Sequence, residues 1–461
     1  MCEFNDIHRC EMLKSSKKQK KKCSVFILIL IHQDMDKISR NNMQIEDILS
    51  DGFRSWKRYV FRLDYSIQAY RDRTISLTYS SLKVSIWTVI NAWMAIILLI
   101  TIGTRIENRF IINVRMLEEM LQSQSMDLLL IHFAIMYALL ECQWIRLFRE
   151  ILDYRSSWNE FFNTNLPYVD DKLENDNRKY LIDFYAVSIR FTGIMLKILK
   201  LFSYFFYSFV IGGLVISNYN DQMDLVKLII MLILVMTPLF TTYEIYGQMF
   251  IAMNFLLFLI EYFTIRLKQL THFKPNIQYS RQKSPTSISE MRRKLLWHRF
   301  HRRYIKIYDE TIKLNGTVRI VLFHMETISK LSIMMSCVFY NRQQMMNVCN
   351  ISAILYMLSD FFFATIVYSR LANIYGHNQL CAKSWMEMIA RSQWLRRNQK
   401  NRLSNFWPYS IKANLFVQTM TNNGLGFTCG RIFLISKYRY FEMICWNIPF
   451  IIIFYKKICY P

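Results

Sequence analysis

Seven long apolar stretches constrain the fold of this chain more than any other feature of its sequence. They cover residues 84–103, 126–146, 194–217, 228–265, 317–340, 349–369 and 432–455. An α-helix of about 20 residues, rising about 1.5 Å per residue, crosses the ~30 Å hydrocarbon core of a bilayer. Each stretch approaches or exceeds that length. We therefore predict an all-α membrane protein with seven transmembrane helices.

The basic residues between these stretches predict the orientation of the chain in the membrane. Segments 1–83, 147–193, 266–316 and 370–431 together carry 44 Lys and Arg residues, whereas the alternate segments carry 7. Loops rich in Lys and Arg stay in the cytoplasm. We expect a cytoplasmic N-terminus, an extracellular C-terminus and a multi-pass protein of the plasma membrane.

The net charge of +24 agrees with this arrangement and needs no nucleic-acid partner. The basic residues lie in alternate loops beside apolar stretches, where they attract the anionic lipids of the cytoplasmic leaflet. We interpret the basic run at 17–22 as a membrane-facing collar rather than a nuclear signal. The expected partners are membrane lipids, not nucleic acid.

Signatures of enzymes and of metal sites are missing from the sequence. It has no His-Glu-x-x-His, no phosphate-binding Walker loop and no Gly-x-Ser-x-Gly. The ten cysteines include no Cys-x-x-Cys pair. We expect no enzyme activity, no metal and no cofactor. Cys337 and Cys349 fall near the external ends of their predicted spans, which leaves a disulfide between them open.

The N-terminal segment 1–83 is expected to be cytoplasmic and partly helical. Its aromatic residues recur mostly every three to five positions, a spacing typical of an amphipathic helix. They are Phe53, Trp56, Tyr59, Phe61, Tyr65 and Tyr70. The pattern allows either a helix on the inner membrane surface or a helix packed under the bundle.

The stretch 228–265 is long for a single span, at ~57 Å if helical throughout. Pro238 interrupts it, so two spans are an alternative. We prefer one helix that projects beyond the outer membrane face. An eighth span would place the basic loop 266–316 outside, against the charge rule.

Two cytoplasmic segments are predicted to extend the bundle as helices. Residues 289–314 show apolar positions at helical spacing and should run directly into the fifth span. Residues 380–421, within the predicted cytoplasmic anchor segment 370–431, show a similar pattern. Partly apolar helices outside lipid need a covering surface, which neighbouring subunits would supply.

The C-terminal region carries a more specific pattern, in which a cytoplasmic helix, a Gly-Phe-Thr-Cys-Gly run and a final span follow one another. The residues of the pattern are Gly426, Phe427, Thr428, Cys429, Gly430, Phe433, Ile435, Ser436, Phe441 and Ile444. It resembles the arthropod gustatory/odorant receptor superfamily of seven-span chemoreceptor channels. The end of the fourth span, 262–270, also resembles that family.

The resemblance has one departure. Gustatory members usually end with Thr-Tyr, five apolar residues and Gln-Phe, whereas residues 447–455 here keep only the apolar middle and the terminal aromatic. The chain is thus similar to a divergent member. The resemblance implies a homo- or hetero-tetramer, assembled through the cytoplasmic helices and the last helix. It also implies a central cation pore and a small-molecule pocket in the outer half of the bundle.

The last span, 432–455, is the pore helix that the resemblance implies. One helical stripe on it combines polar and apolar side chains, as a pore face requires. The stripe consists of Cys445, Asn447, Ile448, Ile451 and Phe454. Its three apolar members would form a dewetting gate, and Asn447 a polar ring. An ordinary packed helix is the alternative interpretation of the same pattern.

Pocket candidates lie in the outer halves of four spans and favour hydroxyl-bearing rings, which suit small organic ligands. They are His132, Met136, Tyr243, Tyr246, Gln248, Ser332, Tyr340 and Tyr356. Some of the tyrosines fit equally well in the aromatic belt at the membrane interface.

Charged residues inside the spans are a further set of candidates, because such charges usually face protein or water. Glu326 and Lys330 stand four apart in the order that favours a helical ion pair. Asp360 and Glu244 have no obvious local partner. Glu141 and Glu261 fall on the inner half, within reach of basic loop residues. At the start of the last span, Glu442 fits either a carboxylate ring at the pore mouth or a salt bridge to Lys437 or Arg439.

These observations lead to one functional hypothesis and two alternatives. The hypothesis is a gustatory-like receptor, a non-selective cation channel opened by a small molecule in the outer bundle. A secondary transporter is the main alternative, although Pro238 is the one clear interruption and no repeat of it is visible. A G-protein-coupled receptor would need the opposite orientation and an Asn-Pro-x-x-Tyr run in the last span.

Overall fold

The computed structural model describes residues 45–103, 126–165, 174–221, 247, 250–271, 287–346, 348–397 and 407–459. Helices make up most of these ranges, which confirms the predicted all-α class. They are α3 (Ile45–Trp56), the π-helix η1 (Lys57–Phe61), α4 (Ile67–Arg71), α5 (Tyr79–Gly103), α7 (Met126–Leu152), α8 (Ser157–Asn165), α9 (Asn175–Asp221), a helix over Phe250–Thr271, α11 (Ser287–Arg342), α12 (Val348–Arg397), α13 (Trp407–Asn422) and α14 (Lys437–Cys459). Two short strands, β1 (Thr428–Cys429) and β2 (Phe433–Leu434), pair as an antiparallel hairpin.

Four of the described helices are long and apolar enough to cross a membrane. They are Asp127–Leu152, Phe250–Thr271, Leu295–Arg342 and Asn350–Arg391. A shorter apolar segment, Ser85–Ile100, lies within α5. The predicted span 194–217 is helical throughout in α9. The predicted span 432–455 is helical only from Lys437 onward, in α14, because Phe433–Leu434 pairs as strand β2 instead. Seven spans therefore remain a prediction. Most of 228–249 lies outside the described residues, so one span or two in that stretch is also untested.

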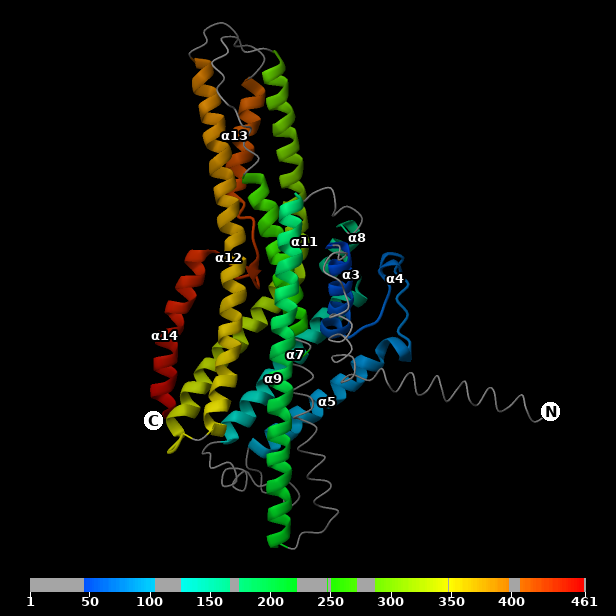
Figure 1. Cartoon of the computed structure of the whole chain (residues 1–461), viewed down its shortest axis with the longest axis vertical. Helices are drawn as coiled ribbons and strands as arrows, with labels where there is room; N and C mark the ends of the chain where they lie inside the picture. The colour runs from blue at the N-terminus through cyan, green and yellow to red at the C-terminus, as the bar shows by residue number, and fades with distance from the viewer. Residues whose placement is uncertain are drawn as a thin grey trace, which may run out of the picture.

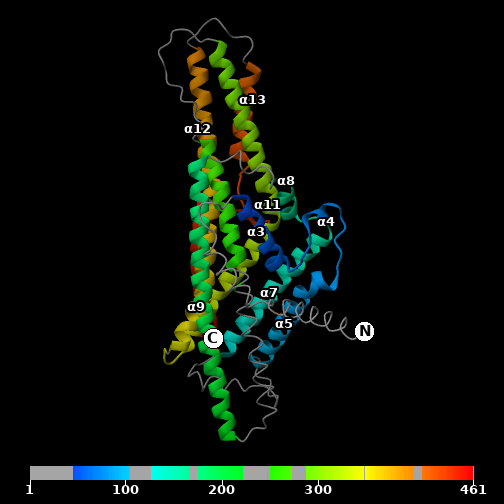
Figure 2. The same cartoon turned by 45° about the vertical axis from the view of Figure 1, so that its right-hand side comes forward.

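Three of the described helices run far past the thickness of a bilayer. At 56 residues, α11 is ~84 Å long, α12, at 50 residues, is ~75 Å long, and α9, at 47 residues, is ~70 Å long. The predicted helical extension 289–314 is continuous with the fifth apolar stretch. Figures 1 and 2 both show α13 lying beside the far ends of α11 and α12. The predicted helix 380–421 is present as the end of α12 and as α13, with 398–406 outside the described residues.

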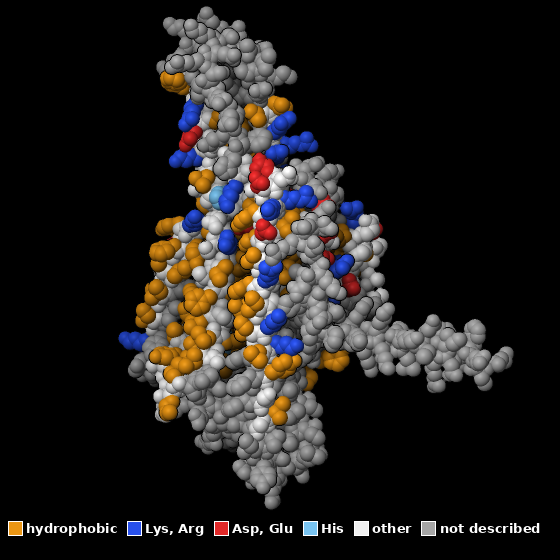
Figure 3. Space-filling view, viewed as in Figure 1, with side chains coloured by type: hydrophobic (Ala, Val, Ile, Leu, Met, Phe, Trp, Pro, Cys, Tyr) orange, Lys and Arg blue, Asp and Glu red, His pale blue; other side chains and the backbone are white. Residues whose placement is uncertain are grey.

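The surface is divided along the long axis of the molecule. Apolar side chains cover the lower half over α9, α12 and α14, whereas Lys and Arg are frequent on the upper extension (Figure 3). Exposed large apolar residues of the lower half include Trp87 on α5, Leu201 on α9 and Phe362 on α12. Soluble monomers seldom expose apolar surface on this scale, so the lower half fits a bilayer.

The helix Phe250–Thr271 lies inside the bundle. Of its most apolar window, 83% is buried, against 28% for the windows of Asp127–Leu152 and Asn350–Arg391. Its Asn254 accepts a hydrogen bond from Ser188 on α9, and its Phe258 ring packs against Tyr185 of α9 at 5.2 Å. This helix is therefore surrounded by protein, whereas Asp127–Leu152 and Asn350–Arg391 expose most of their apolar windows.

The aromatic N-terminal segment packs into the bundle, so the alternative of a helix on the membrane surface is wrong. Trp56 is fully buried and stacks on Trp158 of α8 at 4.2 Å, and Phe53 meets Phe162 at 4.4 Å. The segment is also not one helix. Arg62 has a left-handed backbone (φ 53°) that ends η1, and α4 starts only after Ser66. An N-cap hydrogen bond from the Ala69 N–H to the Ser66 hydroxyl (3.0 Å) begins α4.

Candidate functional site

The Gly-Phe-Thr-Cys-Gly run supplies β1 and the turn of the hairpin of β1 and β2, which leads into α14. Gly430 turns the chain with a positive φ of 58°, a conformation that glycine adopts without steric cost. The Gly430 N–H donates to the Arg319 carbonyl of α11 at 3.0 Å. Asn315 of α11 accepts the Thr428 N–H at 2.9 Å through its side chain. The backbone N–H groups of Thr428 and Gly430 thus hydrogen-bond the hairpin to α11.

The other side of the hairpin is fastened to α12. The Tyr368 hydroxyl donates to the Leu322 carbonyl at 2.9 Å and lies 3.2 Å from Cys429 Sγ. Phe427 and Cys429 are buried between the two helices. Burial raises the pKa of the Cys429 thiol to about 11, so it stays a neutral thiol at physiological pH. Cys429 is therefore a packing residue that ties β1 to both long helices.

Three polar side chains from three helices meet inside the bundle. Ser332 Oγ of α11 donates to Asp360 Oδ2 of α12 at 3.1 Å and lies 3.3 Å from His132 Nε2 of α7. His132 and Ser332 are fully buried, and Asp360 is 6% exposed. His132 and Ser332 were predicted as pocket residues, and the structure brings them together. Asp360 was noted only as an intramembrane carboxylate without a local partner, and its partner is 28 residues away along the chain.

The remaining pocket candidates divide into three groups. Met136 is buried in the same region, and Tyr356 packs its ring against Phe133 at 5.3 Å, next to His132 on α7. Tyr340 is exposed near the end of α11, at a distance along the helix from Ser332. Tyr243, Tyr246 and Gln248 lie outside the described residues. The described part of the candidate site is therefore built by α7, α11 and α12.

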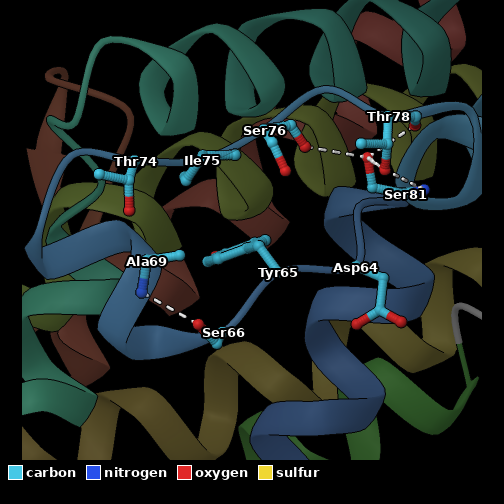
Figure 4. A pocket seen from close by; sticks show the side chains of 9 residues that line it. All are labelled: Asp64, Tyr65, Ser66, Ala69, Thr74, Ile75, Ser76, Thr78 and Ser81. Atoms are coloured by element: carbon cyan, nitrogen blue, oxygen red, sulfur yellow. Dashed lines mark hydrogen bonds between the residues drawn. The ribbon is translucent and has the colours of Figure 1, made fainter.

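A separate pocket of about 310 Å³ lies between α4 and the start of α5 (Figure 4). Its lining is rich in hydroxyls. It consists of Asp64, Tyr65, Ser66, Ala69, Thr74, Ile75, Ser76, Thr78 and Ser81. None of the predicted pocket residues lines it, and no sequence pattern predicts a site in this place.

No protein-family model matches the sequence, and no curated protein matches it. Solved structures do. The chain is similar to the insect olfactory receptor OR5 from Machilis hrabei, with a TM-score of 0.56 and 10% identity, over 92% of this chain and 98% of that chain. The same receptor in complex with eugenol gives a TM-score of 0.55 at 10% identity, over 93% and 98% of the two chains.

The chain has the fold of an insect olfactory receptor. This likeness confirms, at the level of the fold, the resemblance that the C-terminal residues indicated, and it extends over nearly all of both chains. In the olfactory-receptor fold of this chain, α14 is the last element and packs against α11 and α12.

The predicted pore stripe lies on α14, which is one continuous helix through Pro449. Cys445 and Ile448 are exposed on it. The side chains of Asn447, Ile451 and Phe454 lie outside those described. The stripe therefore stays a prediction, with its two described members pointing away from the rest of the subunit.

Four of the charged candidates, Glu326, Glu442, Glu141 and Glu261, form ion pairs. Glu326 and Lys330 form an ion pair at 3.1 Å on α11. Glu442 pairs with Arg439 at 2.7 Å, so the salt-bridge interpretation holds in this structure. Glu141 and Glu261, predicted to meet basic loop residues, reach Arg62 at 2.6 Å and Arg370 at 3.6 Å. Glu244 lies outside the described residues. The Cys337–Cys349 disulfide, which the sequence left open, stays untested, because the Cys349 side chain is not among those described.

Proposed function

We propose that this chain is a gustatory-like chemosensory receptor that forms a ligand-gated, non-selective cation channel in the plasma membrane. The observation that carries the proposal is the likeness to an insect olfactory receptor over 92% of this chain and 98% of the receptor. That receptor is also known in complex with eugenol, a small organic molecule. A small-molecule ligand is the corresponding proposal for this chain.

The proposed topology is seven spans with a cytoplasmic N-terminus and an extracellular C-terminus. Its support is the distribution of 44 basic residues against 7 between alternate segments. The apolar lower half and the basic upper extension in Figure 3 agree with it. In this topology the extension of α11, α12 and α13 is the cytoplasmic anchor.

The proposed ligand pocket lies in the outer half of the bundle. It comprises the described residues His132, Met136, Ser332 and Tyr356, together with Tyr243, Tyr246, Gln248 and Tyr340. A ligand opens the pore by binding the open state more tightly than the closed state. The polar contact among α7, α11 and α12 supports this place, because a ligand there touches the two long helices that hold the hairpin.

The hairpin is the proposed route from the pocket to the pore. It joins α11 and α12 through Asn315 and Tyr368 and continues within a few residues into α14. A relative shift of α11 and α12 therefore moves the base of α14. In the proposed channel, Cys445, Asn447, Ile448, Ile451 and Phe454 face the pore, and the three apolar members close it by excluding water.

The proposed assembly is a homo- or hetero-tetramer. Its support is apolar surface on the cytoplasmic extension, where lipid cannot cover it. Leu295 and Ile312 of α11, Leu380 and Trp394 of α12 and Leu415 of α13 are each half or more exposed. Apolar surface of this kind marks an interface between proteins, and closed symmetry is usual for such assemblies. Exposed Ile448 and Ile452 on α14 give the membrane half a similar surface.

Whole-cell recording with a panel of small organic ligands tests the function. We expect ligand-evoked cation current that persists when G-protein signalling is blocked, with the chain expressed alone or with a co-subunit. A matched pair of variants tests the pore. Ile451→Thr should raise the current without ligand, because it wets the gate, whereas Ile453→Thr, off the stripe, should not.

An epitope tag after Pro461 tests the topology independently. Antibodies should reach the tag on intact cells. A surface-expressed chain that gives no ligand-evoked current under any condition would contradict the channel, and a tag accessible only after permeabilisation would contradict the orientation.

A further inference from the structure

The meeting point of α7, α11 and α12 has a surplus of hydrogen-bond acceptors. Ser332 has one hydroxyl proton and donates it to Asp360. Ser332 Oγ can then only accept from His132 Nε2, which lies 3.3 Å away. We infer from this that the ring proton of His132 is on Nε2. A neutral imidazole with its proton on Nε2 has a bare acceptor at Nδ1. His132 Nδ1 is buried and has no hydrogen-bond partner among the described residues.

The charge of this cluster is also unbalanced. Ser332 is the one hydrogen-bond partner of Asp360 among the described residues, and Asp360 forms no ion pair with any described Lys, Arg or His. The other buried carboxylates of the described residues, Glu141, Glu261 and Glu310, each have an Arg within ion-pair distance. A carboxylate buried in a membrane bundle without a cation is costly, and such a group usually marks a site with a missing partner.

Two aromatic side chains, Tyr356 and Phe133, belong to the surroundings of the cluster. Tyr356 precedes Asp360 by four residues on α12, which places the two side chains on the same face of that helix. Its ring contacts Phe133 at 5.3 Å, and Phe133 contacts the His132 ring at 6.0 Å. Ring faces attract organic cations, so the surroundings of Asp360 add a second preference for positive charge.

We propose that this cluster selects ligands that carry an ammonium group, so that the agonists of this receptor are small organic amines. The proposal rests on the proposed function and names the ligand class of the same pocket. A primary ammonium supplies three donors and no acceptor, which matches the Asp360 carboxylate and the bare His132 nitrogen. A ketone, ester or carboxylate brings only acceptors and leaves the cluster without donors. An alcohol supplies one donor and no charge.

The ligand test compares molecules of one shape that differ in their polar group. The probes are butylamine and hexylamine, the alcohols 1-butanol and 1-hexanol, and hexanoic acid. Whole-cell current is measured for each at neutral pH. We expect amines to act at lower concentration than the matched alcohols by about tenfold or more, since one charge-assisted hydrogen bond has that effect. Tetramethylammonium, which lacks N–H donors, should be a weaker agonist than methylammonium.

Two variants, each with a matched control, test whether the amine response depends on Asp360 and Ser332. Asp360→Asn keeps the shape and removes the charge, and we expect it to weaken the amine response about tenfold or more. The same substitution on the exposed cytoplasmic part of α11, Asp309→Asn, should change nothing. Ser332→Ala should weaken the amine response less than Asp360→Asn. Ser336→Ala removes a hydroxyl that bonds only its own helix, to the Ile333 carbonyl, and should be silent.

Thermal unfolding of the purified full chain in detergent gives a readout that does not need a working pore. Hexylamine should raise the unfolding temperature of the unaltered chain, because a ligand of the folded state stabilises it, and 1-hexanol should raise it less. Without ligand, Asp360→Asn should be at least as stable as the unaltered chain, since it removes an uncompensated charge. Unchanged stability of Asp360→Asn without ligand would show that its weaker amine response comes from a lost binding site and not from misfolding.

The outcomes distinguish failure of the amine proposal from failure of the proposed channel function. Current evoked by alcohols but not by amines, or amine responses that Asp360→Asn leaves unchanged, would overturn the amine proposal and leave the channel intact. Absent current together with amine stabilisation that Asp360→Asn removes would support the site and contradict the channel. Equal stabilisation by amine and alcohol would count against an ammonium site whatever the currents show.

Discussion

Asn315 holds Thr428 across 113 residues of chain: its side-chain oxygen accepts the Thr428 N–H at 2.9 Å, and its amide nitrogen lies 3.2 Å from the Thr428 hydroxyl. One side chain thus fixes both the backbone and the side chain of the first strand of the hairpin. The hairpin is the only covalent connection between α13 and α14, so Asn315 sets where the last helix begins.

Loss of this contact should loosen the hairpin. Asn315→Ala leaves the Thr428 N–H without its acceptor, which should lower the stability by about 1–3 kcal/mol. In recordings it should reduce the maximal ligand-evoked current while surface expression persists. Asn315→Asp keeps the acceptor and should have the smaller effect in thermal unfolding. Thr419→Ala, which removes a hydroxyl bonded within its own helix, is the control. Equal effects of Asn315→Ala and Thr419→Ala would show that the contact does not couple the helices.

The close approach of α3 to the buried helix Phe250–Thr271 depends on Gly52. A Cβ atom at this position would overlap the Phe255 ring, so Gly52→Ala must displace either the ring or α3. We expect destabilisation of about 1–3 kcal/mol from overpacking, measured by thermal unfolding. Gly193→Ala on α9 meets nothing within 4 Å and should be neutral or slightly stabilising. Phe255→Leu in the Gly52→Ala background should restore part of the loss; no recovery would argue against the clash.

The buried Arg62–Glu141 pair, at 2.6 Å, ties the end of the N-terminal segment to α7. Removal of one partner leaves an unpaired buried charge, so Glu141→Gln should lower stability by about 3–5 kcal/mol. The double variant Arg62→Met with Glu141→Leu should recover much of that loss. The measurement is a double-mutant cycle of unfolding temperatures. Additive effects of the two single variants would mean that the pair does not act as a unit.

Acidification should weaken the folded chain through His377 of α12. Burial, then the positive charges of Lys268 and Lys437, lower the pKa of His377 below its ordinary value of 6.5. The unfolded chain therefore binds more protons than the folded chain as the pH falls through 6.5, and stability falls with it. The loss should level off below the folded-state pKa. Unfolding temperatures across this pH range should fall less in His377→Gln than in the unaltered chain; identical profiles would contradict the assignment.

Short-range patterns in the sequence predicted the helices and the local pairs. Apolar length located α5, α7, α11 and α12, and a four-residue spacing located the Glu326–Lys330 pair. Both signals depend on helix geometry alone, which repeats over a few residues. The continuity of α11 from the basic segment into the apolar one could be predicted for the same reason.

Long-range contacts could not be predicted in this way. Ser332 meets His132 across 200 residues, and nothing in the spacing of either residue indicates the other. The aromatic residues from Phe53 to Tyr70 show why: their periodicity fits a membrane surface and a protein core equally well. The presence of Trp158 and Phe255 opposite them decides between the two. The break at Arg62 was missed because a left-handed arginine leaves no mark in composition.

Because α11 is one continuous helix, a small tilt at one end moves the other end by a large distance. A rod of ~84 Å that tilts by about 5° about one end displaces the other end by ~7 Å, several times the shift needed to break a hydrogen bond. A disturbance near Ser332 therefore reaches the far tip of α11 enlarged rather than damped. A protein bound at this tip would sense movement near Ser332 mechanically, whether or not ions flow.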